Sequence, residues 1–455
     1  MSFFLYPGNK LETLAGICCR LLGDEPGSDP MTPETIVVPT QGMAVYLRQF
    51  FARRNGVAAN IDMPFPAGFI SGILKKNIDG FDAASKNFSQ EQLAWEIFSI
   101  FQHEGGEFPE LAGYIGSSND AILKTWQLAH RTAVLFDRYQ IYRYKDEYFP
   151  LKNDEWQSRL WKKLLRKYGK SKMQCCREFL ELQRPVKGLP QRLTVFGVGS
   201  LPPLYLDIFF KISETVDLRF FYMTPCREFW ENLYSVKEQK WLCKDGDMPE
   251  VGNPLLASWG TAGRELFTNL LAHQDNVPYV SSEELLFENY YDDAEAATTL
   301  QQLQQDILTM RDGRQDEKPP VKDDSIEVLN CYASKREVEI LHDKLITVFN
   351  AKETDPGDVI VMAPDINAYL PYINAVFGQG PLKYSYTVSD RNLRGRGGVS
   401  NVFRRLLDLP GCRMEVDDVM GILNNLFVCR SRDITAGEIP VISSWIKKSG
   451  NRWGV

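Results

Sequence analysis

Residues Pro7–Lys10 stand where a nucleotide-binding loop would stand, directly after a predicted buried strand at Phe3–Tyr6. A phosphate-binding loop, G-x-x-x-x-G-K-[S/T], holds phosphates with consecutive backbone N–H groups and Mg²⁺ with its hydroxyl. Here the loop is too short to surround a phosphate, and Leu11 occupies the position of the hydroxyl. The sequence therefore predicts the framework of a nucleotide site without its chemistry.

A second lysine, in Gly169–Ser171, matches the last three positions of such a loop. The first glycine of the loop would fall at position 164, which is Leu164, and the triplet follows a predicted helix rather than a strand. We interpret Gly169 as the end of a helix.

The composition is that of a globular protein with a net negative charge. The 455 residues suggest about three domains, and 44% apolar residues are enough for large cores. The net charge is −7, whereas a free-standing nucleic-acid-binding module is usually basic. Any DNA contact must therefore come from local basic patches, with partners supplying much of the affinity.

The cysteines and histidines do not predict a metal site. Nine cysteines and four histidines include no C-x-x-C and no H-E-x-x-H. We find no apolar run of 18 or more residues and no N-terminal signal. These features predict a cytoplasmic protein with reduced thiols buried mostly in its cores.

Strand–loop–helix units predict an α/β fold with a parallel, doubly wound sheet. A strand at Thr35–Val38 precedes a helix at Met43–Arg54, and residues 72–182 have a helical pattern. Within that segment, Ser89 and Gln92 form a predicted capping box. One face of a helix carries Trp156, Leu160, Trp161, Leu164, Leu165 and Tyr168.

Strands are predicted again beyond this helical segment. Two of them, Leu193–Val198 and Asp217–Met223, flank an apolar helix, and a charged linker follows at 311–324. A second α/β unit is predicted from strands at Ile326–Cys331 and Asp358–Ala363, helices at Arg336–Phe349 and Ile366–Phe377, and a helical pattern after Pro410.

Four blocks of sequence carry a family resemblance: VGNPLLASWGTAGREL (251–266), ANIDMPFPAGFI (59–70), SKREVEILHDKL (334–345) and GNRWGV (450–455). In the first block we expect Gly252–Pro254 to form a turn and Trp259 to be a buried anchor. Through these blocks the chain resembles the N-terminal part of the RecC family, the gamma chains of exodeoxyribonuclease V (the RecBCD complex). The resemblance runs from residue 1 to 455 and covers less than half of a full family member.

The RecC family resembles a superfamily-one helicase whose motor sites have degenerated, and residues here agree. The strand ends Phe196–Ser200, Tyr222–Pro225 and Ala363–Asp365 lack the carboxylates, glutamine or arginine expected of a motor. The resemblance implies degenerate helicase-like (P-loop NTPase-like) parallel-sheet domains with a large helical insertion. The expected boundaries are a first domain at 1–71 and 183–310, the insertion at 72–182, the linker at 311–324, a second domain at 325–410 and the start of a helical subdomain at 411–455.

The same resemblance implies a role in double-strand-break repair and recombination. The chain would guide DNA and recognise a Chi-type sequence without catalysis, metal or cofactor of its own. RecB-like and RecD-like partners would use ATP and Mg²⁺, and the DNA partners would be duplex ends and single strands. The alternative is a subunit with residual helicase or nuclease activity through Lys10, although we see no nuclease carboxylate cluster. An AddB-like chain would need a phosphate loop or iron–sulfur cysteines, and neither is present.

The resemblance also implies which residues contact DNA. Leu135, Asp137 and Arg143 match positions proposed for Chi recognition, and Arg138 is adjacent. The alternatives are a core leucine, a surface aspartate and arginines in salt bridges. The further candidates are Thr40, Gln41, Phe65, Arg391 and Arg394.

Several positions depart from the family pattern. Pro39 and Val45 replace amides, Gln41 replaces a hydroxyl, Phe65 a leucine and Ser71 a tryptophan. Amides read base edges and aromatic rings stack on unpaired bases. The hypothesis is that the DNA channel is kept while the sequence it reads has changed or is no longer read.

Two further basic groups allow two interpretations each. A helix face with Arg159, Lys162, Lys163, Arg166 and Lys167 suits a solvated surface better than contact with duplex phosphates or an acidic partner. The loop Ser389–Gly398, with Arg391, Arg394 and Arg396, suits either a folded turn or a loop that follows a phosphate backbone.

Overall fold

The computed structural model divides into two compact units, Met1–Glu327 and Val328–Val455. We call them the N-terminal and C-terminal units and describe each by itself. The described residues are 3–24, 31–116, 120–145, 155–235, 237–239, 252–273, 298–315, 323–351, 354–378, 386–388, 399–408, 416–423, 425–435 and 437–450.

The N-terminal unit is built on a five-stranded sheet in the order β1-β5-β4-β2-β3. Every neighbouring pair is parallel, with Phe3 opposite Leu218 in one pair and Leu193 opposite Leu218 in another. The predicted α/β class with a parallel sheet is therefore confirmed for this unit. The strands are β1 (Phe3–Gly8), β2 (Glu34–Val37), β3 (Ile61–Asp62), β4 (Arg192–Phe196) and β5 (Asp217–Met223).

Alternate residues of each strand point to opposite faces of the sheet, and both faces are buried. One face packs beneath α1 and α2 and contains Tyr6, Ile36 and Phe221. The other face contains Leu5 and Phe220 and belongs to the larger core, which continues into the helices around it. Burial on both sides explains why these strands are continuous apolar runs.

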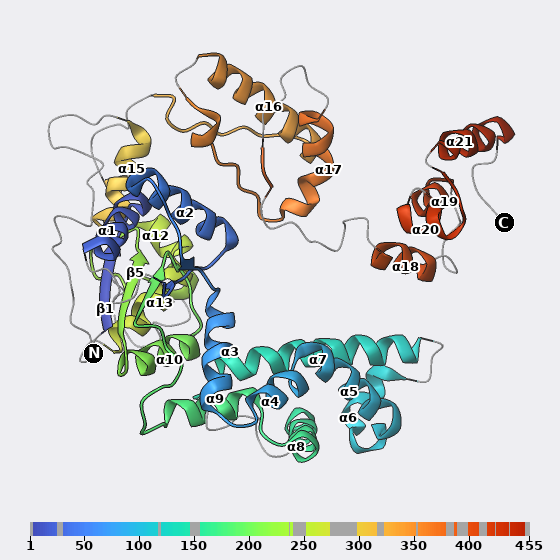
Figure 1. Cartoon of the computed structure of the whole chain (residues 1–455), viewed down its shortest axis with the longest axis horizontal. Helices are drawn as coiled ribbons and strands as arrows, with labels where there is room; N and C mark the ends of the chain where they lie inside the picture. Colours follow the sequence, from blue (N-terminus) through green and yellow to red (C-terminus); the bar gives the residue numbers. More distant parts are fainter. Residues whose placement is uncertain are drawn as a thin grey trace. The chain divides into compact units, whose positions relative to one another are not determined.

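Helices form most of the rest of the N-terminal unit, and α3 leads from the sheet into the helical segment α4–α9 (Figure 1). The longer helices are α1 (Leu11–Asp24), α2 (Gln41–Asn55), α3 (Pro66–Asn77), α4 (Phe81–Asn87), α5 (Gln90–His103), α6 (Pro109–Ile115), α7 (Ala121–Tyr142), α8 (Trp156–Tyr168), α9 (Lys172–Leu180), α10 (Pro203–Ser213), α12 (Pro254–Trp259), α13 (Thr261–Leu271) and α15 (Thr299–Leu308). Short 3₁₀ turns lie at Gly105–Glu107 and Gly313–Gln315.

The helical segment has its own apolar centre around Trp161 of α8. The Trp161 ring lies 5.3 Å from that of Phe88 and 5.0 Å from that of Phe136 of α7. Ser89 caps α5 by accepting a hydrogen bond from the Gln92 N–H, as predicted. The predicted apolar face of Trp156–Tyr168 is also confirmed, since Leu160, Trp161 and Leu164 are buried.

Two expectations concerned residues 252–266. In place of a separate turn at Gly252–Pro254, α12 begins at Pro254, and Asn253 caps it by accepting hydrogen bonds from the N–H groups of Leu255 and Leu256. Trp259 is 81% exposed, so it is not the buried anchor that we expected. The buried tryptophan is Trp230, whose ring lies so close to Gly260 that an added Cβ would come within 2.7 Å of it.

In the C-terminal unit, the regular secondary structure among the described residues is all helical. Its elements are α16 (Ser334–Asn350), a 3₁₀ turn (Pro356–Asp358), α17 (Ile366–Phe377), α18 (Val399–Asp408), α19 (Val416–Leu423), α20 (Leu426–Ser431) and α21 (Glu438–Ser449). The predicted helices at 336–349 and 366–377 and the helical pattern after Pro410 are confirmed.

The strands predicted at Ile326–Cys331 and Asp358–Ala363 are wrong. Residues 326–331 and 359–363 have no strand pairing. Val328 is 89% exposed and Met362 is 83% exposed. A strand needs a hydrogen-bonded neighbour to satisfy its backbone groups, and the described residues of this unit provide none.

The described cysteines are free, and all but Cys331 are buried, which confirms the expectation of thiols in cores. Burial raises the pKa of the Cys176 thiol to about 12, with a smaller contribution from Cys175, so this thiol stays protonated. Among the described residues, no helix combines the length and the apolarity that a membrane crossing requires.

Replacing Trp161 by alanine should destabilise the N-terminal unit by about 3–5 kcal/mol, because a fully buried indole would leave a cavity. Trp95→Ala is the matched control: its indole is 62% exposed, and we expect a loss of less than about 1 kcal/mol. Urea unfolding followed by far-UV circular dichroism measures both losses. Equal losses for the two variants would contradict this packing.

Candidate nucleic-acid interface

The connection between β1 and α1 is two residues long, Asn9 and Lys10. Asn9 is buried, and the Lys10 carbonyl already accepts a hydrogen bond from the Leu14 N–H at 3.2 Å. A phosphate loop places several free N–H groups around its ligand. A connection of this length has no room for that arrangement.

The ends of β4 and β5 are occupied by contacts within the protein. The Gly197 N–H donates to the Phe221 carbonyl at 3.1 Å, and the Thr224 N–H donates to the Gly8 carbonyl at 3.0 Å. Gly197 has a φ of +68°, and a Cβ there would lie 3.1 Å from the Met43 side chain. In the part of the chain that the structure describes, no group of three or more His, Cys, Asp or Glu side chains could hold a metal ion.

Three candidate residues lie at the carboxyl ends of β2 and β3, which are neighbours in the sheet. Thr40 follows β2 and caps α2, with its hydroxyl oxygen accepting from the Met43 N–H at 3.2 Å. Gln41 is the first residue of α2, and its side chain is exposed. Phe65 precedes α3 and is 45% exposed. The carboxyl edge of a parallel sheet is where ligands usually bind such folds, so these three are accessible in a suitable place.

The C-terminal half of α7 presents a row of cationic and aromatic side chains. At about 100° per residue, Leu135, Arg138 and Tyr142 fall on one side of the helix. Leu135 is half-buried, Arg138 is exposed and Tyr142 is 61% exposed. Leu135 is thus not a fully buried core residue, and this side of α7 offers a guanidinium beside an aromatic ring.

Arg143 lies at the end of the same helix and is stacked on an aromatic ring. Its guanidinium carbon is 4.4 Å from the centre of the Tyr139 ring, a cation–π contact. Its backbone N–H donates to the Tyr139 carbonyl and closes the last turn of α7. A guanidinium held over an aromatic face can still offer its N–H groups to an acceptor.

Asp137 does not belong to this row. It lies about 200° around the helix from Leu135, and its carboxylate is 2.6 Å from the Lys172 ammonium of α9. Both side chains are less than one-third exposed. The structure therefore gives Asp137 a role in joining α7 to α9 and separates it from Leu135 and Arg138.

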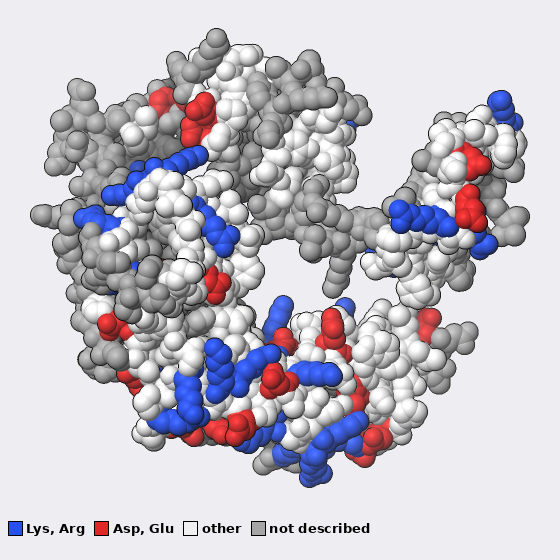
Figure 2. All heavy atoms as spheres, viewed as in Figure 1, with Lys and Arg blue, Asp and Glu red and all other residues white. Residues whose placement is uncertain are grey.

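The basic face of α8 is largely neutralised by carboxylates from α5, α6 and the turn between them. Arg159 pairs with Glu110 at 2.7 Å, and Lys163 pairs with Glu104 and, at 2.9 Å, with Glu107. Lys167 pairs with Glu96, and Arg166 is exposed. In Figure 2, Lys and Arg are interspersed with Asp and Glu over the helical segment rather than gathered in one patch. This face is therefore less solvated than the sequence suggested, because Arg159, Lys163 and Lys167 are paired within the protein.

Glu96 illustrates how strongly these ion pairs are held. Burial alone would raise the pKa of this carboxyl, but hydrogen bonds from Lys167 and Tyr168 hold the pKa below its usual value. The hydrogen bond to Glu96 raises the pKa of Lys167 in turn. These shifts favour the charged forms of both partners, so Lys167 contributes to the packing of α8 on α5.

Two other predictions concern glycine and arginine positions. Gly169 ends α8, with a φ of +79°, and Ser171 caps α9, while Lys170 pairs with Glu178 at 2.7 Å. The interpretation of Gly169 as the end of a helix is confirmed.

Arg391 and Arg394 lie outside the described residues.

Comparison with known proteins places these features in a family. The family described as "RecC, N-terminal domain" matches residues 3–310, which is more than half of the chain. The chain belongs to the RecC family. A second family, "RecBCD enzyme subunit RecC fourth domain", matches residues 397–455.

Individual RecC proteins are similar along the whole chain. RecBCD enzyme subunit RecC of Escherichia coli (strain K12) is 30% identical over 517 residues, covering 99% of this chain and 45% of that protein. The subunit of the same name from Haemophilus influenzae is 28% identical, with 100% and 46% covered. That of Mycolicibacterium smegmatis is 25% identical, with 100% and 43% covered. The chain spans less than half the length of these RecC relatives.

Three residues of α7 in this RecC chain were not predicted from the sequence as candidate site residues: Arg131, Tyr139 and Tyr142. Arg131 is exposed on the same side of the helix as Arg138, one heptad earlier. Tyr139 and Arg143 are four residues apart, and residues at this spacing are neighbours on a helix. Helical periodicity applied to residues 131–143 would have found all three.

Lys163→Met should lower the stability of the N-terminal unit by about 0.5–1 kcal/mol, since it removes contacts to two carboxylates. Arg166→Met is the control, because Arg166 is exposed on the same face, and we expect a change within about 0.5 kcal/mol. Thermal melts at low and high salt provide the measurement, and salt should reduce the difference. A Lys163 variant as stable as the wild type would show that these pairs do not hold α8.

Proposed function

We propose that this chain is a non-catalytic, DNA-guiding part of a RecBCD-type helicase–nuclease that acts in double-strand-break repair and recombination. In this proposal it conducts single-stranded DNA, recognises a Chi-type sequence in it and leaves force generation to its partners. The partners are a RecB-like and a RecD-like subunit, since the relatives are named as subunits of the RecBCD enzyme. ATP and Mg²⁺ are used in those partners.

The two-residue connection of β1 to α1 is the observation that carries the non-catalytic part of the proposal. A parallel sheet with a strand–loop–helix start has the general layout of a nucleotide-binding domain, and we propose that it is a degenerate helicase-like one. Without a loop of free N–H groups, the γ-phosphate and Mg²⁺ of a nucleotide cannot be positioned for hydrolysis. We keep the domain boundaries expected from the sequence as part of the proposal.

The row on α7 supports the DNA-guiding part. Unpaired bases stack on aromatic rings, and phosphates are attracted by nearby cations. Arg138, Tyr142 and the Arg143–Tyr139 pair provide both kinds of group within three turns of one helix. Thr40, Gln41 and Phe65 are further contacts at the carboxyl edge of the sheet. Asp137 serves by holding α7 against α9 rather than by touching a base.

In this proposal, the DNA sequence that this chain recognises differs from the one recognised by relatives with the usual family pattern. Val45 is 43% exposed on α2 and has no group that could pair with a base edge. Pro39 and Ser71 likewise lack the amide and the indole of the pattern. The test is the response of the assembled complex to the family's usual Chi octamer. A response as full as that of a relative would contradict the proposed change in the DNA sequence that is read.

The chain should not hydrolyse ATP when single-stranded DNA is added, because its β1–α1 connection cannot surround a phosphate. Phosphate release is measured for the wild-type chain and for Lys10→Ala, with a DNA-free sample as control. We expect the wild type and Lys10→Ala to release phosphate at the same rate, no faster than the DNA-free sample. DNA-stimulated hydrolysis that disappears in Lys10→Ala would support the alternative of residual motor activity instead.

Arg143→Ala should weaken binding of single-stranded DNA roughly tenfold, because it removes a cation held beside an aromatic ring. Arg159→Ala is the matched control, since its guanidinium is bound to Glu110, and it should change the affinity less than about twofold. Fluorescence anisotropy with a labelled single strand gives the affinities, and circular dichroism verifies folding. An unfolded Arg143→Ala protein, or equal loss in both variants, would make Arg143 a structural residue.

A further inference from the structure

Asp207 of α10 joins two segments that are distant in the sequence. Its carboxylate lies 2.8 Å from the Lys145 ammonium and 3.3 Å from Nε2 of His273, and it accepts a hydrogen bond from the Tyr144 hydroxyl. The Asp207 side chain is 14% exposed. Tyr144 and Lys145 follow α7 directly, and His273 lies just beyond α13. One largely buried carboxylate thus connects the ends of α7 and α13 to α10.

The His273 ring is fixed by three contacts. Its Nδ1 is 2.9 Å from the Asn269 carbonyl oxygen, and its Nε2 is 3.3 Å from the Asp207 carboxylate. The ring also stacks on Phe210 of α10 with 4.0 Å between centroids. His273 therefore links the end of α13 to α10.

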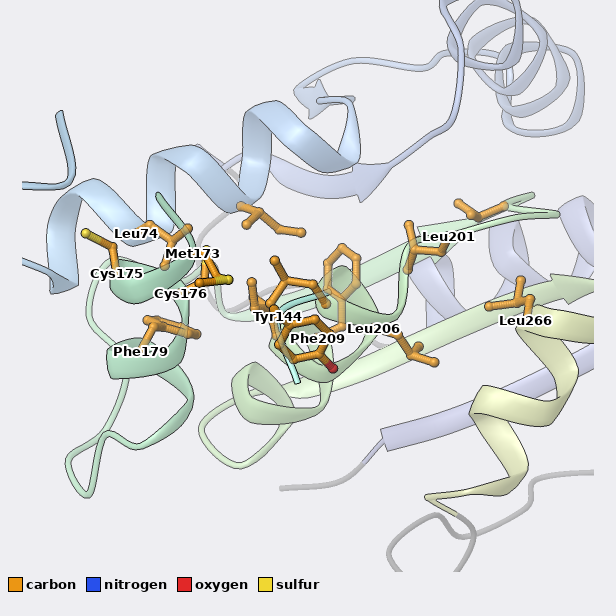
Figure 3. Close-up of a cluster of buried hydrophobic side chains, with 14 of the residues drawn as sticks. Leu74, Tyr144, Met173, Cys175, Cys176, Phe179, Leu201, Leu206, Phe209 and Leu266 are labelled. Carbon is orange, nitrogen blue, oxygen red and sulfur yellow. The ribbon is translucent and has the colours of Figure 1, made fainter. Parts of the chain in front are cut away.

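Tyr144 is held from two sides. Burial and the hydrogen bond to Asp207 raise the pKa of its phenol, which keeps the hydroxyl protonated as a donor. Its carbonyl accepts from Nε of Arg177 in α9 at 2.6 Å. Figure 3 places Tyr144 among buried side chains of α9 and α10, such as Met173, Cys176 and Phe209.

We propose that Asp207, held in turn by His273, is a positioning residue for the DNA-contacting end of α7. The inference rests on the proposed function, because Arg143 immediately precedes Tyr144. By fixing Tyr144 and Lys145, Asp207 fixes where α7 ends and hence the direction of the Arg143 guanidinium and the Tyr139 ring beneath it.

Single-strand affinity at one fixed pH tests the proposal on the whole chain. We expect His273→Ala and Asp207→Asn to bind single-stranded DNA roughly threefold to tenfold more weakly than the wild type. His130→Ala is the matched control, because His130 is exposed on α7 and its replacement should leave the affinity unchanged. Wild-type affinity in His273→Ala would overturn the proposal.

Hydrogen exchange of the segment 138–145 distinguishes this inference from the proposed function, because it needs no DNA. Asp207→Asn and His273→Ala should raise the exchange of this segment above that of the wild type at the same pH. Unchanged exchange in His273→Ala would overturn the positioning role, and this variant decides if Asp207→Asn does not fold. If exchange rises in the variants but the wild type binds no single-stranded DNA, the positioning role stands and the DNA-guiding function is refuted.

Discussion

Burial of the parallel sheet on both faces is the constraint on which the N-terminal unit depends. Parallel strands are joined by crossovers rather than by tight turns, and each crossover must cover one face of the sheet. α1 and α2 cover one face, while the crossover between β3 and β4 contains α3 and the whole helical segment α4–α9. The position of α7 is therefore set by how α3, α9 and α10 pack together on the other face.

Much of the fold could be predicted from the sequence wherever an element is specified by residues close together in the chain. The apolar runs of β1 and β5 and the bounds of α17 were predicted almost to the residue. The strands expected at 326–331 and 358–363 have suitable residues but find no neighbour to pair with among the residues that the structure describes, and pairing is a property of distant parts of a chain. Trp259 was misjudged for the same reason, since Trp230 already fills the space beside Gly260.

The candidate site was predictable to a similar extent. The shortness of the β1–α1 connection needed only residue counting, and the Arg143–Tyr139 contact is a helical neighbour pair. The partners of the α8 cations were not predictable, because their carboxylates stand 49 to 71 residues earlier in the chain. Asp137 likewise looked like a base-reading residue beside Leu135 until its ion pair with Lys172 placed it on another side of α7.

The distribution of charge decides which cations are available to a polyanion. In a chain with a net charge of −7, the α8 face holds the helical segment together, since a phosphate would have to displace a bound carboxylate from most of its cations. On α7, Arg138 is exposed and Arg143 rests on a ring rather than on a carboxylate. Because α7 offers few cations, its affinity for DNA depends on the directions in which those side chains point. The direction of Arg143 is set where α7 meets α10. That junction is polar, and a largely buried carboxylate is costly to leave without its donors. The end of α7 is therefore well defined while Asp207 keeps its donors and poorly defined when one of them is removed.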